Sequence, residues 1–393
     1  VPDLGARSDG IVQVADTGDA QALAEAACHV AGGRPAGLLS WYDGTMVATA
    51  RAAELLDLPT PPATALQRAR HKYSARRAMR AAGLPAPAFA LIGAAEEADR
   101  VAAEVGLPAI IKPVNGTASS LVRRVTDVAG LAAAYRELAA HAGETLPGLY
   151  GHVLTDPDTG ARLDPARTFL VEGLLAGPEY SADVIVRDGM VEHVVLLDKF
   201  LIDDDFFERG FCWPPLGVDA DKQARIYRAV DGAVRALDVD NTTAHVEVRD
   251  DPLLGPTVVE VNAGRPGGQI IGVLAALGTG IDLRAEHLAL ALGAPRPDRG
   301  APRLPPPLAT LTVFGDRSGR LVRIDGLDEA AEHPDVMAVV PFVSPGDHLD
   351  ALRETFPVNF LVAGLETRDE LVATYKELAE IVHLVIEPDP TDA

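Results

Sequence analysis

The chain has few aromatic residues, two cysteines and a shortage of positive charge. Aromatic residues make up 5% of its 393 residues, so its cores must be built mainly from alanine, valine, leucine and isoleucine. Cys28 and Cys212 lie far apart and fit no zinc or redox spacing, which favours a reducing, cytoplasmic compartment. The net charge of −22 argues against nucleic acid or an anionic membrane as a partner, so a bound phosphate would need local cations, a metal ion or backbone amides.

A signal peptide and long apolar runs are also missing, so the sequence predicts no membrane span. The chain begins without methionine in a turn-like segment, and we expect an earlier segment to precede it. A typical domain size of roughly 150 residues predicts two or three domains for this chain. The proline-rich tract at residues 295–307 predicts a linker between them.

Hydrophobic patterning before this linker alternates between strands and helices, which is typical of α/β folds. Apolar runs predict strands at residues 11–14 and 37–40, and helical periodicity predicts helices at 20–31 and 46–56. Further helices are expected at 65–82 (basic), 91–105, 131–142, 222–237 and 281–292. Further strands are expected at 107–114, 168–172, 180–187 and 191–197, with a loop at 203–215.

Beyond the linker the pattern changes to that of a separate α+β domain at about residues 308–393. Strands are expected there at 309–314, 321–324, 336–341 and 359–364, and helices at 327–332 and 368–381.

The most informative stretch is NTTAHVEVRDDPLLGPTVVEVNAGRPGG, residues 241–268, which reads as two strands joined by a turn. Side chains two residues apart share one face of a strand, so His245 and Glu247 point the same way, as do Glu260 and Asn262. In a hairpin, two carboxylates and an amide can therefore converge. Mg²⁺ takes such oxygen ligands when it is held together with substrate phosphates. Two solvated acids on a hairpin remain the alternative.

Cationic and small residues elsewhere suggest a phosphate site. Lys112 ends an apolar strand and precedes the small-residue loop PVNGTASS, which contains Ser119 and could approach a phosphate closely. Lys72 lies on the basic helix, and Arg265, Gly267 and Gly268 follow the hairpin. The alternatives are a solvated basic helix face for Lys72 and its neighbours, and an ordinary exposed lysine before a turn for Lys112.

A second group of residues suits a flat or small-molecule ligand. Glu172 and Glu179 flank a Gly-Pro turn between two strands, where a strand edge can bind a base and a carboxylate can accept ribose hydroxyls. Lys199 could neutralise an anionic substrate. Arg209 and Trp213 belong to an aromatic-rich loop that could cover a pocket, or form a satellite hydrophobic cluster. We interpret His245 as structural or as a support for the residues of the site, with a catalytic role as the alternative.

Taken in order, these segments resemble the ATP-grasp superfamily of carboxylate–amine ligases. The similar segments are the helix with Lys72, then IIKPVNGTASS, VEGLLAGPEYS, HVEV and VVEVN. The segment from ATLTVFGDRSGRLVRIDGL to HPDVMAVVPFVSPGD resembles the C-terminal domain of the L-amino-acid ligase branch, the bacilysin-type dipeptide synthetases of antibiotic biosynthesis. The fold implied is an N-terminal Rossmann-like α/β domain (residues 1–68), an ATP-grasp domain (69–306, with a lid at about 106–175) and a C-terminal α+β domain (307–393).

The resemblance also implies roles for individual residues. Lys72, Lys112 and Ser119 would bind ATP phosphates, Glu172 the adenine and Glu179 the ribose. The hairpin side chains Glu247, Glu260 and Asn262 would hold two Mg²⁺ ions, for which Mn²⁺ can substitute. Arg265, with Lys112, would act in catalysis, and substrate contacts would come from Lys199, Arg209, Trp213, His245, Gly267 and Gly268.

The resemblance implies an enzyme that uses ATP to join a small-molecule carboxylate to an amine. It also suggests a homodimer. The sequence departs from the family at Gly264, which moves Arg265 one residue further from Asn262, and in a phosphate loop poor in glycine. A bicarbonate-phosphorylating carboxylase and a non-catalytic nucleotide-binding protein remain alternative functions.

Overall fold

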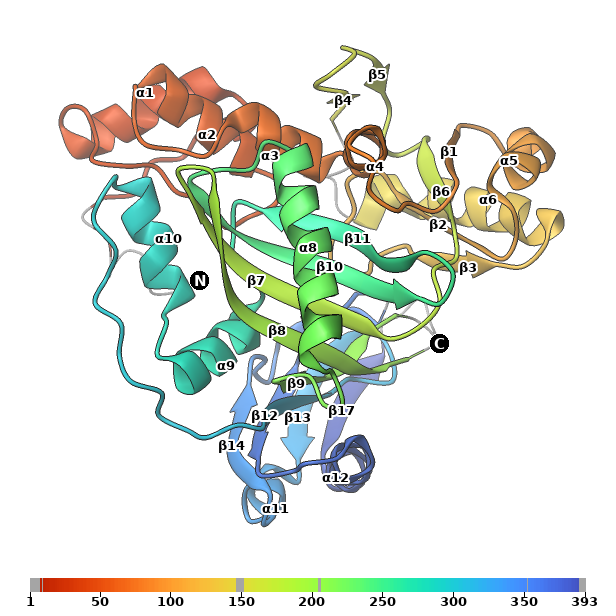
Figure 1. Ribbon diagram of the computed structural model, residues 1–393, viewed down its shortest axis with the longest axis vertical. Helices are drawn as coiled ribbons and strands as arrows, with labels where there is room; N and C mark the ends of the chain where they lie inside the picture. The colour runs from red at the N-terminus through yellow and green to blue at the C-terminus, as the bar shows by residue number, and fades with distance from the viewer. Residues whose placement is uncertain (1–7, 9, 146–151, 204–205, 352, 389–393) are drawn as a thin grey trace.

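The computed structural model describes residues 8, 10–145, 152–203, 206–351 and 353–388. Its N-terminal part consists of helices packed beside one end of a long sheet (Figure 1). They are α1 (Ala20–Ala31), α2 (Met46–Leu55), α3 (Ala63–Arg70) and α4 (Lys72–Ala81). The side chain of Asp19 caps α1 by accepting hydrogen bonds from the backbone of its first turn, and Gly32 ends it with a left-handed conformation.

Two features of this part differ from the sequence prediction. The prediction of strands at residues 11–14 and 37–40 is wrong. No neighbouring strand among the described residues offers them backbone partners, and Ile11 remains 67% exposed. The single basic helix expected at 65–82 is two helices, since the chain leaves helical geometry at His71, with ψ at 84°. The described residues before Phe89 therefore form helices and connecting loops but no strand.

A small lobe follows, built on a four-stranded antiparallel sheet with the order β1-β6-β2-β3. Helices α5 and α6 cover this sheet (Figure 1), and its core is rich in alanine, valine and leucine. Its elements are β1 (Phe89–Ile92), η2 (Ala95–Glu97), α5 (Ala98–Val105), β2 (Ala109–Pro113), β3 (Arg123–Val125), α6 (Val128–Thr145), β4 (Leu154–Thr155), β5 (Arg162–Leu163) and β6 (Phe169–Gly173). The helix expected at 91–105 is shorter, because its first residues pair with β6 as a strand.

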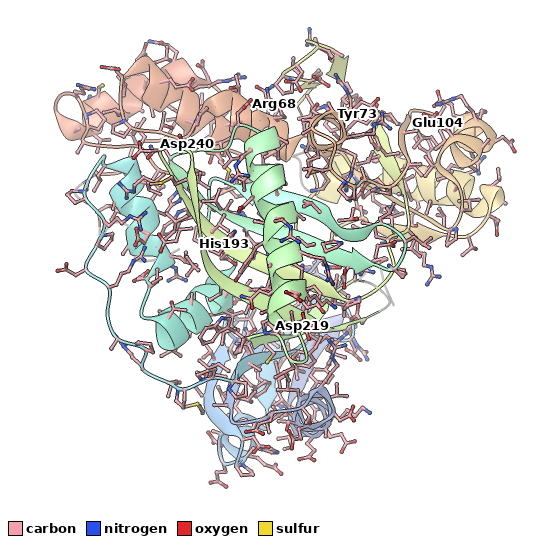
Figure 2. All side chains as sticks on the ribbon, viewed as in Figure 1. Arg68, Tyr73, Glu104, His193, Asp219 and Asp240 are labelled. Carbon is pink, nitrogen blue, oxygen red and sulfur yellow. The ribbon has the colours of Figure 1, made fainter. Side chains whose placement is uncertain are left out.

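The large sheet has eight strands in the order β11-β10-β7-β8-β9-β12-β16-β14. Helix α8 covers one face of its first strands, and α9 and α10 pack on the other (Figure 1). These elements are β7 (Glu179–Arg187), β8 (Met190–Ile202), β9 (Glu208–Trp213), α8 (Ala220–Ala236), β10 (Thr242–Asp251), β11 (Gly255–Ala263), α9 (Gln269–Thr279) and α10 (Leu283–Ala291). Figure 2 labels Asp219, whose carboxylate caps α8. Much of the loop expected at 203–215 is strand β9, and α9 was not expected.

The C-terminal segment extends the large sheet with β12, β16 and β14 and also forms a separate three-stranded sheet in the order β15-β13-β17. Strand β9 pairs antiparallel with β12, with Gly210 opposite Leu311. The segment contains β12 (Leu308–Val313), β13 (Gly319–Asp325), α11 (Leu327–Ala331), β14 (Val336–Pro341), β15 (His348–Leu349), β16 (Val358–Ala363), α12 (Arg368–Ile381) and β17 (His383–Pro388). No helix of the described residues has the length and apolar character needed to cross a membrane.

Candidate active site

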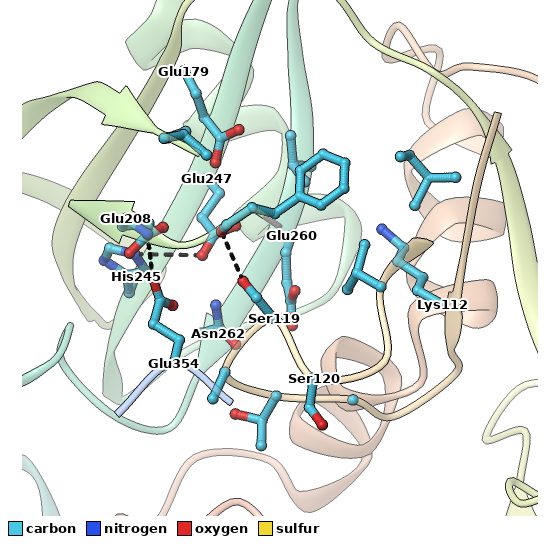
Figure 3. Close-up of a pocket in the computed structure, with 18 of the residues that line it drawn as sticks. Lys112, Ser119, Ser120, Glu179, Glu208, His245, Glu247, Glu260, Asn262 and Glu354 are labelled. Carbon is cyan, nitrogen blue, oxygen red and sulfur yellow. Dashed lines mark hydrogen bonds and ion pairs between the residues drawn. The ribbon is translucent and has the colours of Figure 1, made fainter. Parts of the chain in front are cut away.

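The hairpin predicted from residues 241–268 forms, and it defines one wall of a cavity of about 560 Å³. Strands β10 and β11 pair so that His245 lies opposite Asn262 and Glu247 opposite Glu260. All four side chains line the cavity (Figure 3). The opposite face of these strands is a valine-rich surface buried under α8. Alternating polar and apolar residues therefore separate the site from the core.

Two lysines face this hairpin from the rest of the cavity wall. Lys72, the first residue of α4, forms an ion pair with Glu260 and donates a 2.9 Å hydrogen bond to the carbonyl of Gly116. Burial lowers the pKa of Lys72, while the charge of Lys72 outweighs burial at Glu260 and lowers the pKa of that carboxyl. Lys112, on β2, also lines the cavity. The structure thus brings these two predicted cations to the predicted metal ligands.

Glu172 is held between two cations. Its Oε2 lies 2.5 Å from Lys112 Nζ, and its Oε1 accepts a 2.6 Å hydrogen bond from Arg76 Nε. Burial would raise the pKa of Glu172, but the charges of Arg76 and Lys112 outweigh it and hold the pKa at about 2. Sequence reasoning missed Arg76, which it counted within a solvated basic face, although the side chain is only 3% exposed.

Glu179 belongs to a second ion-pair cluster around Lys199. The ammonium of Lys199 lies 2.9 Å from Glu179 Oε1 and 3.4 Å from Glu247 Oε1, and it also pairs with Glu208. Arg249 donates a 2.6 Å hydrogen bond to the other oxygen of Glu179. Lys199 is completely buried, so it supports the cavity wall from behind.

Two further acids of this cluster were missed by sequence reasoning. Glu354 lines the cavity and accepts a hydrogen bond from the backbone N–H of Glu208 (Figure 3). Burial raises the pKa of Glu208 and, with the charge of Glu208 beside it, raises the pKa of Glu354 well above its usual range. Glu354 lies near the C-terminal strands, and no local pattern marks it. Glu208 begins a strand that was expected to be a loop.

The loop after Lys112 lines the cavity from Gly116 to Ser120. Ala118 and Ser119 adopt left-handed backbone conformations, with φ of 52° and 49°. Such conformations are unfavourable for residues other than glycine and concentrate at functional sites. Ser119 Oγ donates a 3.1 Å hydrogen bond to the carbonyl of Phe206, so in this structure the hydroxyl ties the loop to the start of the β9 region.

The residues after the hairpin approach the same site. Arg265 and Gly268 line the cavity, whereas the N–H of Gly267 donates a 2.6 Å hydrogen bond to Asp183 Oδ1. His245 Nδ1 lies 2.9 Å from the other oxygen of Asp183. Burial would lower the pKa of His245, but the adjacent carboxylate raises it. These contacts fit the structural role that we expected for His245.

Arg209 and Trp213 are not among the cavity-lining residues that the structure describes. The guanidinium of Arg209 bonds to Asp203, at 2.7 Å, and to the hydroxyl of Tyr375. Trp213 packs in the hydrophobic core between β9 and α9. The structure gives no support to the substrate contacts expected for these two residues, because strand β9 directs them into packing and ion pairs away from the cavity.

The oxygen-bearing side chains of the hairpin suit Mg²⁺ only in part. No three His, Cys, Asp or Glu side chains of the described part of the chain gather in a way that could hold a metal ion. Glu247, Glu260 and Asn262 offer two carboxylates and an amide on one face. Mg²⁺ is normally bound by one or two carboxylates together with substrate phosphates, so this set fits an ion that arrives with a nucleotide better than a permanent site.

Comparison with known proteins agrees with this geometry. Residues 105–273 match the ATP-grasp domain, and residues 312–387 match the L-amino acid ligase C-terminal domain 2. The crystal structure of the L-amino acid ligase from Bacillus licheniformis superposes with a TM-score of 0.77 at 25% identity, over 94% of this chain and 86% of that one. The expected mixed α/β ATP-grasp fold is confirmed. The chain belongs to the ATP-grasp superfamily and carries the C-terminal domain found in L-amino acid ligases.

Two curated proteins that are similar to this chain are longer than it. The uncharacterized protein y4rH of Sinorhizobium fredii is 30% identical over 319 residues, which are 79% of this chain and 60% of that protein. Carnosine synthase 1 of Gallus gallus is 27% identical over 300 residues, which are 74% of this chain and 31% of that protein. The chain therefore spans less than two thirds of either relative.

Proposed function

We propose that the protein uses ATP to activate the carboxylate of an amino acid as an acyl phosphate and joins it to an amine, releasing ADP and phosphate. One observation carries this proposal: Glu247, Glu260 and Asn262 share a cavity with Lys72 and Lys112. The cavity therefore contains both ligands for a cation and cations for phosphates.

The proposed roles follow from the side chains that line each wall. Lys72, Lys112 and the loop with Ser119 bind the ATP phosphates. The strand edge at residues 172–175 lines the cavity and receives the adenine, with the ribose toward Glu179. Glu247, Glu260 and Asn262 of the hairpin would hold two Mg²⁺ ions, which would supply positive charge to the phosphates.

The chemistry proceeds in two displacements. A carboxylate oxygen attacks the γ-phosphorus and ADP leaves; the amine nitrogen then attacks the acyl carbon, phosphate leaves, and the nitrogen loses a proton. Positioning and electrostatic stabilisation carry most of the phosphoryl transfer. Arg265 lines the cavity near the hairpin and stabilises charge on the transferring group. The lid at about residues 106–175 excludes water from the acyl phosphate.

The amino-acid substrate is supported by the C-terminal domain. A carboxylase that phosphorylates bicarbonate shares the ATP-grasp core, but the match of residues 312–387 is to a domain of L-amino acid ligases. Strand β9, which carries Glu208, pairs with β12 of this region, and Glu354 lines the cavity. The same domain thus borders the proposed substrate space.

The test is product analysis with Mg²⁺-ATP and pooled amino acids, followed by mass spectrometry. We expect ADP and phosphate that depend on the amino acids, and a product one water lighter than the sum of two components. Release of ADP only with bicarbonate would establish the carboxylase instead, and no release with either would favour a non-catalytic protein.

Glu260→Gln should lose at least about 100-fold in kcat while staying folded, because the change removes charge and keeps volume. Glu104→Gln, at a carboxylate that is 54% exposed on α5, is the matched control and should behave as wild type. Wild-type turnover by folded Glu260→Gln would refute the metal assignment.

A further inference from the structure

Asp43 lies in the loop before α2 and does not line the cavity, yet its carboxylate meets three functional segments. Its side chain is 11% exposed, and Oδ1 lies 3.0 Å from Arg70 Nη1. The same oxygen lies 3.3 Å from Arg265 Nε. The other oxygen accepts a 2.7 Å hydrogen bond from Thr117 Oγ1 in the phosphate loop. A single carboxylate therefore links the cavity arginine to this loop.

The Thr117 contact completes a series of anchors along the loop. The backbone carbonyls of the three residues before Thr117 accept hydrogen bonds of 2.9 to 3.0 Å from Lys72 and Arg70. Arg70 bonds to the loop and to Asp43 at the same time. The first half of the phosphate loop is thus held by Lys72 and by Arg70, and Arg70 also pairs with Asp43.

Gly264 explains how Arg265 reaches Asp43. Its φ is +92°, and a Cβ at this position would come within 2.6 Å of Met46 Sδ at the start of α2. The chain can make this turn against α2 because glycine has no side chain. Met46 is three residues after Asp43, so the inserted glycine brings Arg265 to the loop that carries Asp43.

The carboxylate of Asp43 is charged in this setting. Burial alone would raise its pKa, but the guanidinium groups of Arg70 and Arg265 outweigh burial and lower it. An ionised acceptor orients guanidinium and hydroxyl donors more strongly than a neutral one. Asp43 therefore accepts hydrogen bonds from Arg265 and Thr117 as an ionised carboxylate.

We propose that Asp43 is a positioning residue that couples the phosphate loop to Arg265, so that the guanidinium faces the transferring phosphoryl group when the loop is in place. The proposal rests on the proposed function, because it assigns Asp43 a role in that reaction. Asp43 acts through Arg265 and Thr117 and touches no reacting atom.

Steady-state kinetics of Asp43→Asn test the coupling. We expect kcat to fall about 10- to 100-fold, with a smaller change in KM for ATP, because misplacing a catalytic group by about 1 Å can cost about 100-fold in rate. The double variant Asp43→Asn/Arg265→Ala should be no slower than Arg265→Ala alone. Losses that multiply would overturn the proposal. The matched control is Asp57→Asn, at a fully exposed aspartate of the same region, which should keep wild-type kinetics.

A second variant covers the case in which Asp43→Asn does not fold. Thr117→Val removes one arm of the link and keeps the size of the side chain. It should lower kcat in the wild-type background and have no effect in the Arg265→Ala background. An equal effect in both backgrounds would show that Thr117 acts independently of Arg265 and would overturn the coupling.

Hydrogen exchange without substrates separates this proposal from the proposed function. In Asp43→Asn, amides of residues 114–122 and of 263–268 should both exchange faster, whereas Asp57→Asn should change neither segment. Unchanged exchange at 263–268 would overturn the coupling in any case. If the exchange result holds while wild type releases no ADP with any amino acid, the reaction is wrong and the physical link stands.

Discussion

Replacing Lys199 by methionine should destabilise the protein strongly. The side chain of Lys199 has no exposed surface, and its ammonium contacts the carboxylates of Glu179, Glu208 and Glu247. Methionine keeps most of the volume but removes the charge. Breaking a buried ion pair by removing one partner costs about 3–5 kcal/mol, because the remaining charge stays buried without compensation. We expect a loss of this size in the free energy of unfolding near neutral pH.

The loss should depend on pH in a defined direction. Burial would lower the pKa of Lys199, but the three carboxylates raise it well above its ordinary value, so the wild-type contribution is complete below the unfolded pKa of about 10.4. In Lys199→Met, Glu179 and Glu208 lose a charge that lowers their pKa values. A carboxyl with a raised folded pKa stabilises the fold at low pH and loses that contribution as the pH rises. The deficit should therefore be larger at pH 8 than at pH 5.

Urea unfolding followed by tryptophan fluorescence at pH 5 and pH 8 measures both effects. The matched control is Lys222→Met, because Lys222 pairs with Asp250 at 2.9 Å but is partly exposed. The control should lose about 1 kcal/mol or less. A loss below about 1 kcal/mol for Lys199→Met, or a larger deficit at pH 5 than at pH 8, would refute the reasoning.

Two further predictions concern charge in the same cavity. The pKa of about 2 for Glu172 lies below the unfolded value of about 4.3, so its contribution is present above the unfolded pKa and lost as the pH falls toward 2. Glu172→Gln should flatten the decline of melting temperature between pH 5 and pH 2, and an unchanged decline would contradict this account. Because Lys72 pairs with Glu260, ATP should bind more weakly in calorimetry when EDTA removes divalent cations. This dependence should shrink in Glu260→Gln, and equal dependence in both proteins would contradict the pairing argument.

The hairpin could be predicted from sequence because one local rule governs it. Alternation along a strand fixes which side chains share a face, and a short turn forces the two strands to pair. His245 and Glu247 therefore had to lie near Glu260 and Asn262, as the register shows. A second local pattern, an apolar run followed by a loop of small residues, correctly predicted that Lys112 lies near the end of a strand.

Residues brought to the site by long-range packing could not be predicted in this way. Asp43, Glu208 and Glu354 lie in segments with no repeated pattern, and their proximity to the cavity depends on how three separate parts of the chain pack. Arg76 shows the opposite error, because the many cations near it in the sequence suggested a solvated helix face. The burial of Arg76 follows from Glu172, which lies 96 residues away.

Both ends of the chain show that the partner of a strand is set by long-range packing. A strand is stable only beside another strand, so an apolar run such as residues 11–14 forms none when no partner is adjacent. At the other end the strands were correctly expected, but β12 pairs with β9 and so joins the large sheet. Local patterns predict the tendency to be a strand, while the choice of partner is decided by the whole fold.

A net charge of −22 opposes the binding of an anionic nucleotide, and the site provides local cations against this repulsion. Two lysines that line the cavity are each paired with a carboxylate, Lys72 with Glu260 and Lys112 with Glu172. These pairs hold the lysines in place without mutual repulsion before any ligand binds. A phosphate that takes Lys72 from Glu260 leaves a buried carboxylate without its partner, which is unfavourable unless a cation replaces the lysine. The same pairing that retains the lysines therefore favours binding of phosphate and metal together over binding of either alone.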